Sequence, residues 1–327
     1  GSGLLASLGP LVGLNQVAHG KMSRQAYLEQ YGHRGPHEFE LSVPRPAESP
    51  EWLDEQLAQL RASPVDVEGL LARRNAEFEA AWNRFQVRYA RKARSIRRRI
   101  EEAGRRARMR EEIRSEYVRD RWLVRAFALR AGELTGLRDD IFFLTVDEVL
   151  GVLAGDERAI TYIPARRETF RNYKGLPPYP SLIRGRFDPF QWAADPGRRS
   201  DFFDSFAPQP ELTSNADRPN TLLGSPGSAG RVEGVVRRLD RPEDGHQLQA
   251  GEVLVTMQTD IAWTLLFPRA AAVVTDVGAP LSHAAIVARE LGMPAVVGCG
   301  DATMRLKTGN RVLVDGGRGV VKVLDAN

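Results

Sequence analysis

The chain has 327 residues, of which 42% are hydrophobic and 27% charged, and its formal net charge is +4. These proportions are typical of globular proteins, and the length predicts two domains of ordinary size. No apolar run approaches the roughly 18 residues of a membrane helix and no secretory signal is visible, so we expect a cytoplasmic protein without a membrane partner. The single cysteine, Cys299, excludes an internal disulfide and fits a reducing compartment.

The first part of the sequence predicts helices. Ser23 can cap a short helix that ends near Gln30, and a second short helix is expected over residues 50–61. Two long amphipathic helices follow, over 66–102 and 104–134, with a break at Gly104. Their apolar positions, which are more typical of a core than of a cofactor site, are Leu70, Phe78, Trp82, Phe85 and Tyr89 in the first and Ile113, Tyr117, Leu123, Phe127 and Ala131 in the second.

The same helices are strongly basic. From Arg84 to Arg130 there are 17 Lys or Arg residues against six Asp or Glu. A solvated helix face explains the excess of basic residues. The lack of interleaved aromatic residues or a known binding motif makes nucleic-acid binding the less favoured explanation. Arg110 and Arg114 are four residues apart and share a helix face, where two guanidiniums repel unless an anion or carboxylate lies between them. They form either a surface pair or a phosphate-binding pair.

The last part of the sequence predicts a compact domain of strands and helices. Thr145 can cap a helix over 146–153, residues 156–204 look loop-rich and aromatic, and the proline-containing segment 207–222 is typical of a linker. The expected strands are 230–237, 253–256, 271–275, 294–297, 311–314 and 319–324, with helices over 261–266 and 282–291. The predicted fold is therefore α+β in two domains, a helical one over 1–206 and a compact β/β/α one over 223–327.

Residues 275–298 read TDVGAPLSHAAIVARELGMPAVVG. A buried strand ends at Thr275, Gly278 and Pro280 predict a loop, and Ser282 occupies the position of a helix N-cap. His283 is then the first residue of a helix that ends at Gly292. It faces free backbone N–H groups and the positive end of the helix dipole, which together form a phosphate site.

Three roles are open to the imidazole of His283 on residue type alone. As a nucleophile it would attack a phosphoryl donor, because its reference pKa leaves the ring mostly neutral at pH 7. A metal-binding role needs further His, Cys or carboxylate ligands at suitable spacing, and we predict no metal site. A structural role in capping or packing is the third possibility.

The string matches every fixed position of T-D-x-G-x-x-x-S-H-x-A-I-x-A-R-E-x-G-x-P-A-V-x-G. It thereby resembles the swivelling phosphohistidine domain of phosphoenolpyruvate-utilising enzymes, a superfamily that includes phosphoenolpyruvate synthases, pyruvate phosphate dikinases and rifampin phosphotransferases. The resemblance implies that His283 carries a phosphoryl group between two sites. It also implies that Ser282, Gly278 and Thr275 surround that group.

Segments of the helical part resemble the same proteins, closest in architecture to rifampin phosphotransferases. Residues 31–38 are similar to a Y-G-x-R-G-x-x-E element, with His37 where small residues such as glycine are usual. Residues 110–114 are similar to an R-E-x-x-K element, with arginine in place of the lysine. The resemblance implies that Arg110 and Arg114 neutralise the phosphoryl group and that Arg34 and Glu38 orient the acceptor; a structural role for the last two is the alternative.

A phosphohistidine carrier needs a phosphoryl donor, and no ATP-grasp segment or P-loop stands in this sequence. We therefore expect ATP and Mg²⁺ to bind in an ATP-grasp domain or subunit outside this sequence. The chain is then expected to be the C-terminal part of a larger enzyme or half of a split pair, with a helical domain that is incomplete at its N-terminus. The expected acceptor is a small organic molecule, since no TIM barrel of the pyruvate-using kind follows. The alternatives are a non-catalytic binding or regulatory module and a fragment of a phosphoenolpyruvate or pyruvate dikinase.

Overall fold

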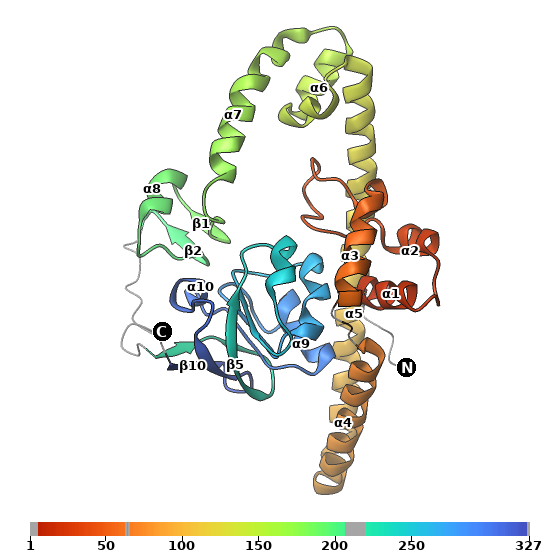
Figure 1. Cartoon of the computed structure of the whole chain (residues 1–327), viewed down its shortest axis with the longest axis vertical. Helices are drawn as coiled ribbons and strands as arrows, with labels where there is room; N and C mark the ends of the chain where they lie inside the picture. The colour runs from red at the N-terminus through yellow and green to blue at the C-terminus, as the bar shows by residue number, and fades with distance from the viewer. Residues whose placement is uncertain (1–5, 63, 65, 207–219, 326–327) are drawn as a thin grey trace.

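The computed structural model describes residues 6–62, 64, 66–206 and 220–325. Figure 1 shows a largely helical first part and a β-sheet with a few helices after it, which confirms the predicted α+β class. No helix in these residues is long and apolar enough to cross a membrane.

Three short helices open the described chain, and their bounds are α1 Gly9–Ala18, α2 Arg24–Tyr31 and α3 Pro50–Ala62. Ser23 caps α2 as predicted, its Oγ accepting from the backbone N–H of Ala26 at 3.1 Å. A small core of Leu14, Tyr27 and Leu53 holds the three together.

The long helices divide at a different residue from the one predicted. Helix α4 spans Val67–Arg88 and α5 spans Ala90–Thr135, so the break lies at Tyr89 and the prediction of a break at Gly104 was wrong. An internal glycine weakens an exposed helix by only about 1 kcal/mol, and ion pairs from Glu102 to Arg105 and Arg106 span the position. The helix ends at Thr135, one residue beyond the predicted 134, and its C-cap is Gly136, whose φ is +73°.

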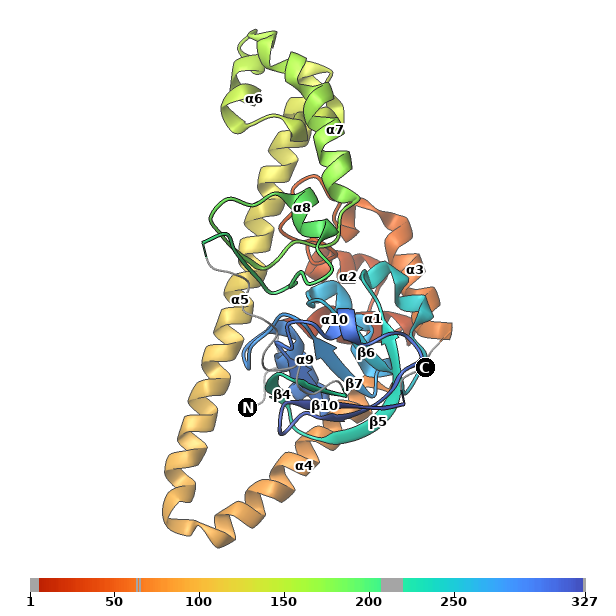
Figure 2. The same ribbon diagram turned by 90° about the vertical axis from the view of Figure 1, so that its left-hand side faces the viewer.

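The apolar stripe of α5 is exposed, which corrects its prediction as core. Side chains such as Ile113 and Phe127 are 59% and 70% exposed, and of the five predicted positions only Ala131 is buried. Figure 2 shows the reason: α5 runs along one side of the whole molecule, so its outward face is left uncovered. The rings on α4 lie against each other and against α5, with Arg97 of α5 over Trp82.

Residues 156–204, predicted to be loop-rich, contain more regular structure than expected. Thr145 starts its helix with the predicted cap, in a capping box with Glu148. The elements are η2 Arg138–Phe143, α6 Val146–Leu153, η3 Glu157–Tyr162, α7 Ile163–Lys174, β1 Leu182–Arg184, α8 Pro189–Ala194 and β2 Phe202–Asp204. The aromatic residues of this segment pack on one another, with Tyr179, Phe187 and Trp192 in mutual ring contact.

An eight-stranded sheet has the order β3-β10-β9-β5-β6-β7-β8-β4. Its strands are β3 Thr221–Leu223, β4 Ser225–Ser228, β5 Arg231–Arg238, β6 Val253–Thr256, β7 Ala272–Thr275, β8 Ala295–Val297, β9 Arg311–Asp315 and β10 Val320–Asp325. The pairs from β5 through β8 are parallel and the others antiparallel. Helix α9, His283–Leu291, follows β7, and the four-residue α10, Ala302–Arg305, follows β8. The remaining turns are η1 Pro46–Glu48, η4 Pro242–Gln247, η5 Ile261–Leu265 and η6 Phe267–Arg269.

The helical part packs directly on the sheet part. Leu8, Leu11 and Val67 share one hydrophobic cluster with the buried face of α9, and Arg74 of α4 pairs with Glu290 of α9 at 3.0 Å. Of the predicted linker, residues 207–219 lie outside the described residues, and Thr221 already belongs to β3. The domain boundaries therefore stay a prediction.

Candidate functional site

The site is built where two parallel strands end. Strands β6 and β7 are parallel neighbours, so the segments that follow them, 257–260 and 276–282, meet at one edge of the sheet. The second of these segments leads into α9 and places His283 at its first position, as predicted.

Gly278 and Thr275 shape the loop before α9. A Cβ at Gly278 would lie 2.9 Å from Cβ of Val297, so only glycine lets the loop lie this close to β8. Thr275 is fully buried, and its hydroxyl donates to the carbonyl of Val277 at 2.9 Å. The side chain of Thr275 therefore braces the loop, and in this arrangement it is engaged away from a phosphoryl group.

Ser282 takes the N-cap position by its backbone, with φ −70° and ψ 162°, but its side chain makes no capping hydrogen bond. Its Oγ is buried and has no hydrogen-bond partner among the described residues. A buried hydroxyl without a partner is unfavourable, so this atom is available to a ligand that accepts a hydrogen bond.

The imidazole of His283 is 7% exposed and is held between two hydroxyls. Its Nδ1 lies 3.0 Å from Oγ1 of Thr259, and its Nε2 lies 3.2 Å from Oγ1 of Thr264. Burial lowers the pKa of His283 to about 3, with the charges of Arg114, Arg34 and Arg110 acting in the same direction. The ring is therefore neutral at physiological pH, which is the form that can act as a nucleophile.

The ring is not sealed from solvent. His283 lines a cavity of about 630 Å³ together with residues of both parts of the chain. From the helical part these include Glu38, Phe39 and Arg114, and from the sheet part they include Thr259 and Asp260. A small molecule in this cavity would contact the helical part and the imidazole at once.

A buried carboxylate joins two of the predicted arginines. Glu38, which is 1% exposed, accepts from Nε of Arg34 at 2.8 Å and from Nε of Arg114 at 3.0 Å. Arg34 is 3% exposed, and its Nη1 is buried without a partner among the described residues. The guanidinium of Arg114 also lies over the ring of Phe39. Glu38 thus fixes both guanidiniums and leaves a donor of Arg34 unused.

Arg110 and Arg114 serve different places although they lie one turn apart. Arg110 donates through Nη1 to the carbonyl of Leu281 at 2.9 Å and pairs through Nη2 with Glu111 at 3.2 Å. It therefore contacts the loop just before His283, whereas Arg114 lines the cavity. The structure thus brings Arg34, Glu38, Arg110 and Arg114 close enough for the three arginine charges to act on His283.

Sequence reasoning missed Thr259, Asp260 and Thr264. These residues follow β6, and the signal that could have found them is topological: polar residues after one parallel strand meet those after its neighbour. Arg289 and Glu290, near the end of α9, contact different parts of the chain. Arg289 donates to the carbonyl of Gly227 at 2.8 Å, while Glu290 pairs with Arg74.

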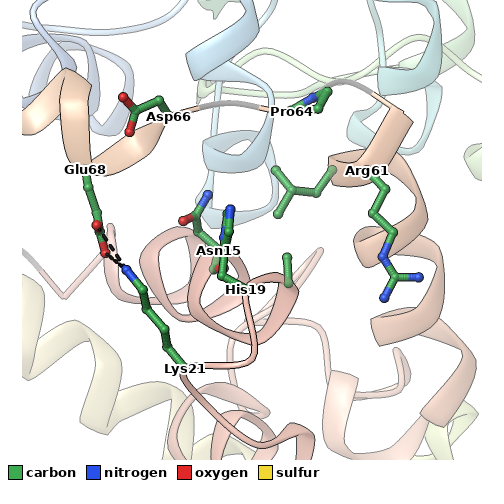
Figure 3. Close-up of a pocket in the computed structure, with 9 residues that line it drawn as sticks. Asn15, His19, Lys21, Arg61, Pro64, Asp66 and Glu68 are labelled. Atoms are coloured by element: carbon green, nitrogen blue, oxygen red, sulfur yellow. Dashed lines mark hydrogen bonds and ion pairs between the residues drawn. The ribbon is translucent and has the colours of Figure 1, made fainter.

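A second cavity, of about 550 Å³, lies on another part of the surface between α1, α3 and α4. Figure 3 shows that Lys21 there is joined to Glu68. The Nδ1 atom of His19 lies 2.8 Å from the backbone carbonyl oxygen of Asn15. None of the predicted site residues lines it. Within the described ranges, no cluster of three or more His, Cys, Asp or Glu could hold a metal ion.

Two protein-family models match parts of this chain. Residues 248–319 match the mobile domain of PEP-utilising enzymes, and residues 11–138 match the fourth domain of rifampicin phosphotransferase. The chain therefore belongs to the superfamily of phosphoenolpyruvate-utilising enzymes and carries its mobile domain. This membership supports a role in phosphoryl transfer.

Individual relatives are longer. An uncharacterized protein of Mycobacterium tuberculosis is 34% identical over 312 residues, which cover 92% of this chain and 31% of that protein. The rifampicin phosphotransferase of Streptomyces sviceus is 35% identical over 188 residues, 57% of this chain and 19% of that protein. The phosphoenolpyruvate synthase of Aeropyrum pernix is 47% identical over 116 residues, 35% of this chain and 14% of that protein. The chain thus spans less than a third of the length of each.

Proposed function

We propose that this chain is the phosphocarrier and acceptor-binding part of an ATP-dependent phosphotransferase, with His283 as the residue that is phosphorylated. The observation that carries the proposal is a neutral imidazole at the first position of α9 that opens onto a cavity shared with the helical part. The donor and acceptor sites would lie on different domains, and the histidine would serve each in turn.

The first step is attack on ATP. A lone pair of one ring nitrogen of His283 forms a bond to phosphorus while the phosphorus–oxygen bond to the leaving nucleotide or phosphate breaks, and the proton on the other ring nitrogen is released to solvent. We expect ATP and Mg²⁺ to be bound by an ATP-grasp domain outside this chain. Both ring nitrogens are hydrogen-bonded to threonine hydroxyls, so one of these bonds must be given up before a nitrogen can attack.

The phosphoryl group would be held by donors that have no other partner. The hydroxyl of Ser282 and Nη1 of Arg34 are both buried and unpaired in the described structure, and the first N–H groups of α9 are free by geometry. Arg114 adds charge from the cavity wall. Such preorganised donors stabilise the negative charge of the transferring group.

The second step delivers the phosphoryl group to a small organic acceptor in the 630 Å³ cavity. Between the two steps the mobile domain would swing, which requires the Arg74–Glu290 and Arg110–Leu281 contacts and the α9 packing to open. The described arrangement, with His283 facing Glu38 and Arg114, corresponds to the acceptor-facing position.

A labelling experiment tests the first step. The chain is incubated with an ATP-grasp partner and Mg²⁺, using ATP labelled in the β position in one sample and in the γ position in another. We expect one label to be retained on the protein in an acid-labile, alkali-stable form and to be lost in His283→Ala. No retained label with a partner that consumes ATP would contradict the proposal.

A second candidate is a binding or regulatory module that does not transfer phosphate. The burial of His283 and its two hydrogen bonds favour it, since they are also what a packed structural histidine would make. If this second candidate is correct, wild type and His283→Ala both stay unlabelled, and the cavity still binds its ligand.

A further inference from the structure

The transfer from phosphohistidine to a hydroxyl acceptor needs a place for a proton. This inference rests on the proposed function. As the acceptor oxygen bonds to phosphorus, the phosphorus–nitrogen bond breaks and its electron pair returns to the imidazole. The hydroxyl proton must leave at the same time, and a side chain in the cavity has to accept it.

The cavity beside His283 offers few bases. Its carboxylates are those of Glu38, Glu40, Asp240 and Asp260, and its other titratable base is His37. Glu38 is occupied by two guanidiniums, and Asp240 accepts from Arg238 through both oxygens at 3.1 and 3.3 Å. A carboxylate whose oxygens already accept hydrogen bonds from arginine has less capacity left to accept a proton.

Two of the remaining groups lie toward solvent. Glu40 is exposed, and one of its oxygens accepts from the backbone N–H and the hydroxyl of Ser42 at 3.0 and 2.8 Å. His37 is exposed as well, and its backbone lies in the left-handed region with φ +51°. That conformation explains why glycine suits this position.

Asp260 differs from all of these. It lines the same cavity as His283, and it directly follows Thr259, whose hydroxyl contacts the His283 ring at 3.0 Å. One oxygen accepts from the backbone N–H of Ala262 at 3.0 Å at the start of η5. Within the described residues Asp260 forms no ion pair with a lysine or arginine.

The surroundings of Asp260 make its carboxylate a stronger base than usual. Burial raises its pKa, and the negative charge of Glu38 acts in the same direction. The charges of His37 and Arg114 and the bond from Ala262 lower the pKa and do not offset the burial.

We propose that Asp260 accepts the proton of the acceptor hydroxyl during transfer of the phosphoryl group from His283. The imidazole recovers the electron pair of the broken phosphorus–nitrogen bond and takes a proton back, so Asp260 relays the proton from acceptor to ring. Summed over the step, the acceptor exchanges its proton for a phosphoryl group, and no further reactant is needed.

The test separates phosphorylation of His283 from its discharge. Wild type, Asp260→Asn and Asp260→Glu are phosphorylated with phosphoramidate, and transfer to ethanol or to the more acidic trifluoroethanol is followed by ³¹P NMR. Asparagine retains an oxygen for the N–H of Ala262, so η5 keeps its cap. We expect equal loading of the three proteins, about a hundredfold slower transfer to ethanol in Asp260→Asn, and partial recovery in Asp260→Glu.

The choice of two alcohols distinguishes proton transfer from a structural effect. An acidic alcohol needs less help from a base, so Asp260→Asn must slow the transfer to trifluoroethanol less than the transfer to ethanol. The control Asp156→Asn, at the N-cap of η3 and outside this cavity, should change neither rate by more than about threefold. Equal slowing of both alcohols, wild-type rates in Asp260→Asn, or no transfer from phosphorylated wild type would overturn the role of Asp260 and leave the carrier role intact. Failure of His283 to accept a phosphoryl group would overturn both.

Discussion

The buried, neutral His283 predicts a specific dependence of stability on pH. The pKa of the ring is lowered to about 3 in the folded protein, whereas in the unfolded chain it returns to about 6.5. Below pH 6.5 the unfolded state therefore binds a proton that the folded state does not. The contribution of His283 to stability is complete above the unfolded pKa and is lost as the pH falls from about 6.5 toward 3.

The size of the effect follows from the shift. Each pH unit in this window lowers the free energy of unfolding by about 1.4 kcal/mol for one such group, so at pH 5 the loss is about 2 kcal/mol. His33 acts in the same direction, because burial and then the charges of Arg119, Arg34 and Arg45 lower its pKa to about 3. The raised pKa values of Asp260 and Asp276 act in the opposite direction.

A substitution of His283 isolates its contribution to the pH dependence of stability. Urea unfolding at pH 7 and pH 5 should show that His283→Gln loses about 2 kcal/mol less than wild type between these values, since all other groups are common to both proteins. His246→Gln, at an exposed histidine, is the matched control and should follow wild type. The reasoning is refuted if His283→Gln has the same pH dependence as wild type.

Three further predictions concern the frame of the site. In Glu38→Gln the buried Arg34 loses its counter-charge, so the free energy of unfolding in urea should fall by about 3 kcal/mol. The control Glu40→Gln should lower it by less than about 0.5 kcal/mol. A fall in Glu38→Gln no larger than in the control would contradict the assignment of Glu38 as the link between Arg34 and Arg114. Gly132→Ala would place a Cβ 2.3 Å from the carbonyl oxygen of Arg138 and should lower stability by about 3 kcal/mol. On the same helix, the new Cβ of Gly104→Ala would meet only the end of the Arg108 side chain, and this variant should raise stability by about 0.5 kcal/mol. Thermal melts of the two variants test whether Gly104 lies inside an unbroken helix. Burial, and next the charges of Asp276 and Asp301, raise the pKa of the Cys299 thiol, so iodoacetamide should label it only in denaturant; rapid labelling of the native protein would show that this part of the sheet is open.

Local sequence signals predicted the frame of the sheet part well. The β6 bounds agree with the prediction, and α9 lies between the expected cap residues Ser282 and Gly292, because caps and buried apolar runs are local signals. The break at Tyr89 was missed because the only local signal, Gly104, is tolerated in an exposed helix. The exposure of Phe127 was missed because a periodic pattern shows that a face is apolar without showing whether another element covers it.

In the candidate site, too, the features set by local sequence were predicted and those set by packing between distant segments were not. The position of His283 at a helix start follows from a continuous stretch of sequence. Arg34, Glu38 and Arg114 were proposed by resemblance, and their convergence on one carboxylate depends on packing between α5 and a distant loop. Thr259 and Thr264 could not be found from their own surroundings, since their contact with the imidazole arises only when β6 and β7 lie side by side.

The most direct test of the account is to locate the phosphoryl group on the protein. The chain holds five histidines, and phosphoramidate is small enough to enter the cavity beside His283. After mild treatment of the folded protein, fragmentation mass spectrometry under alkaline conditions should find the phosphoryl group on His283, and much less of it in protein unfolded before treatment. Modification of the exposed His37 and His246 with none on His283 would contradict the central claim that this imidazole accepts phosphate.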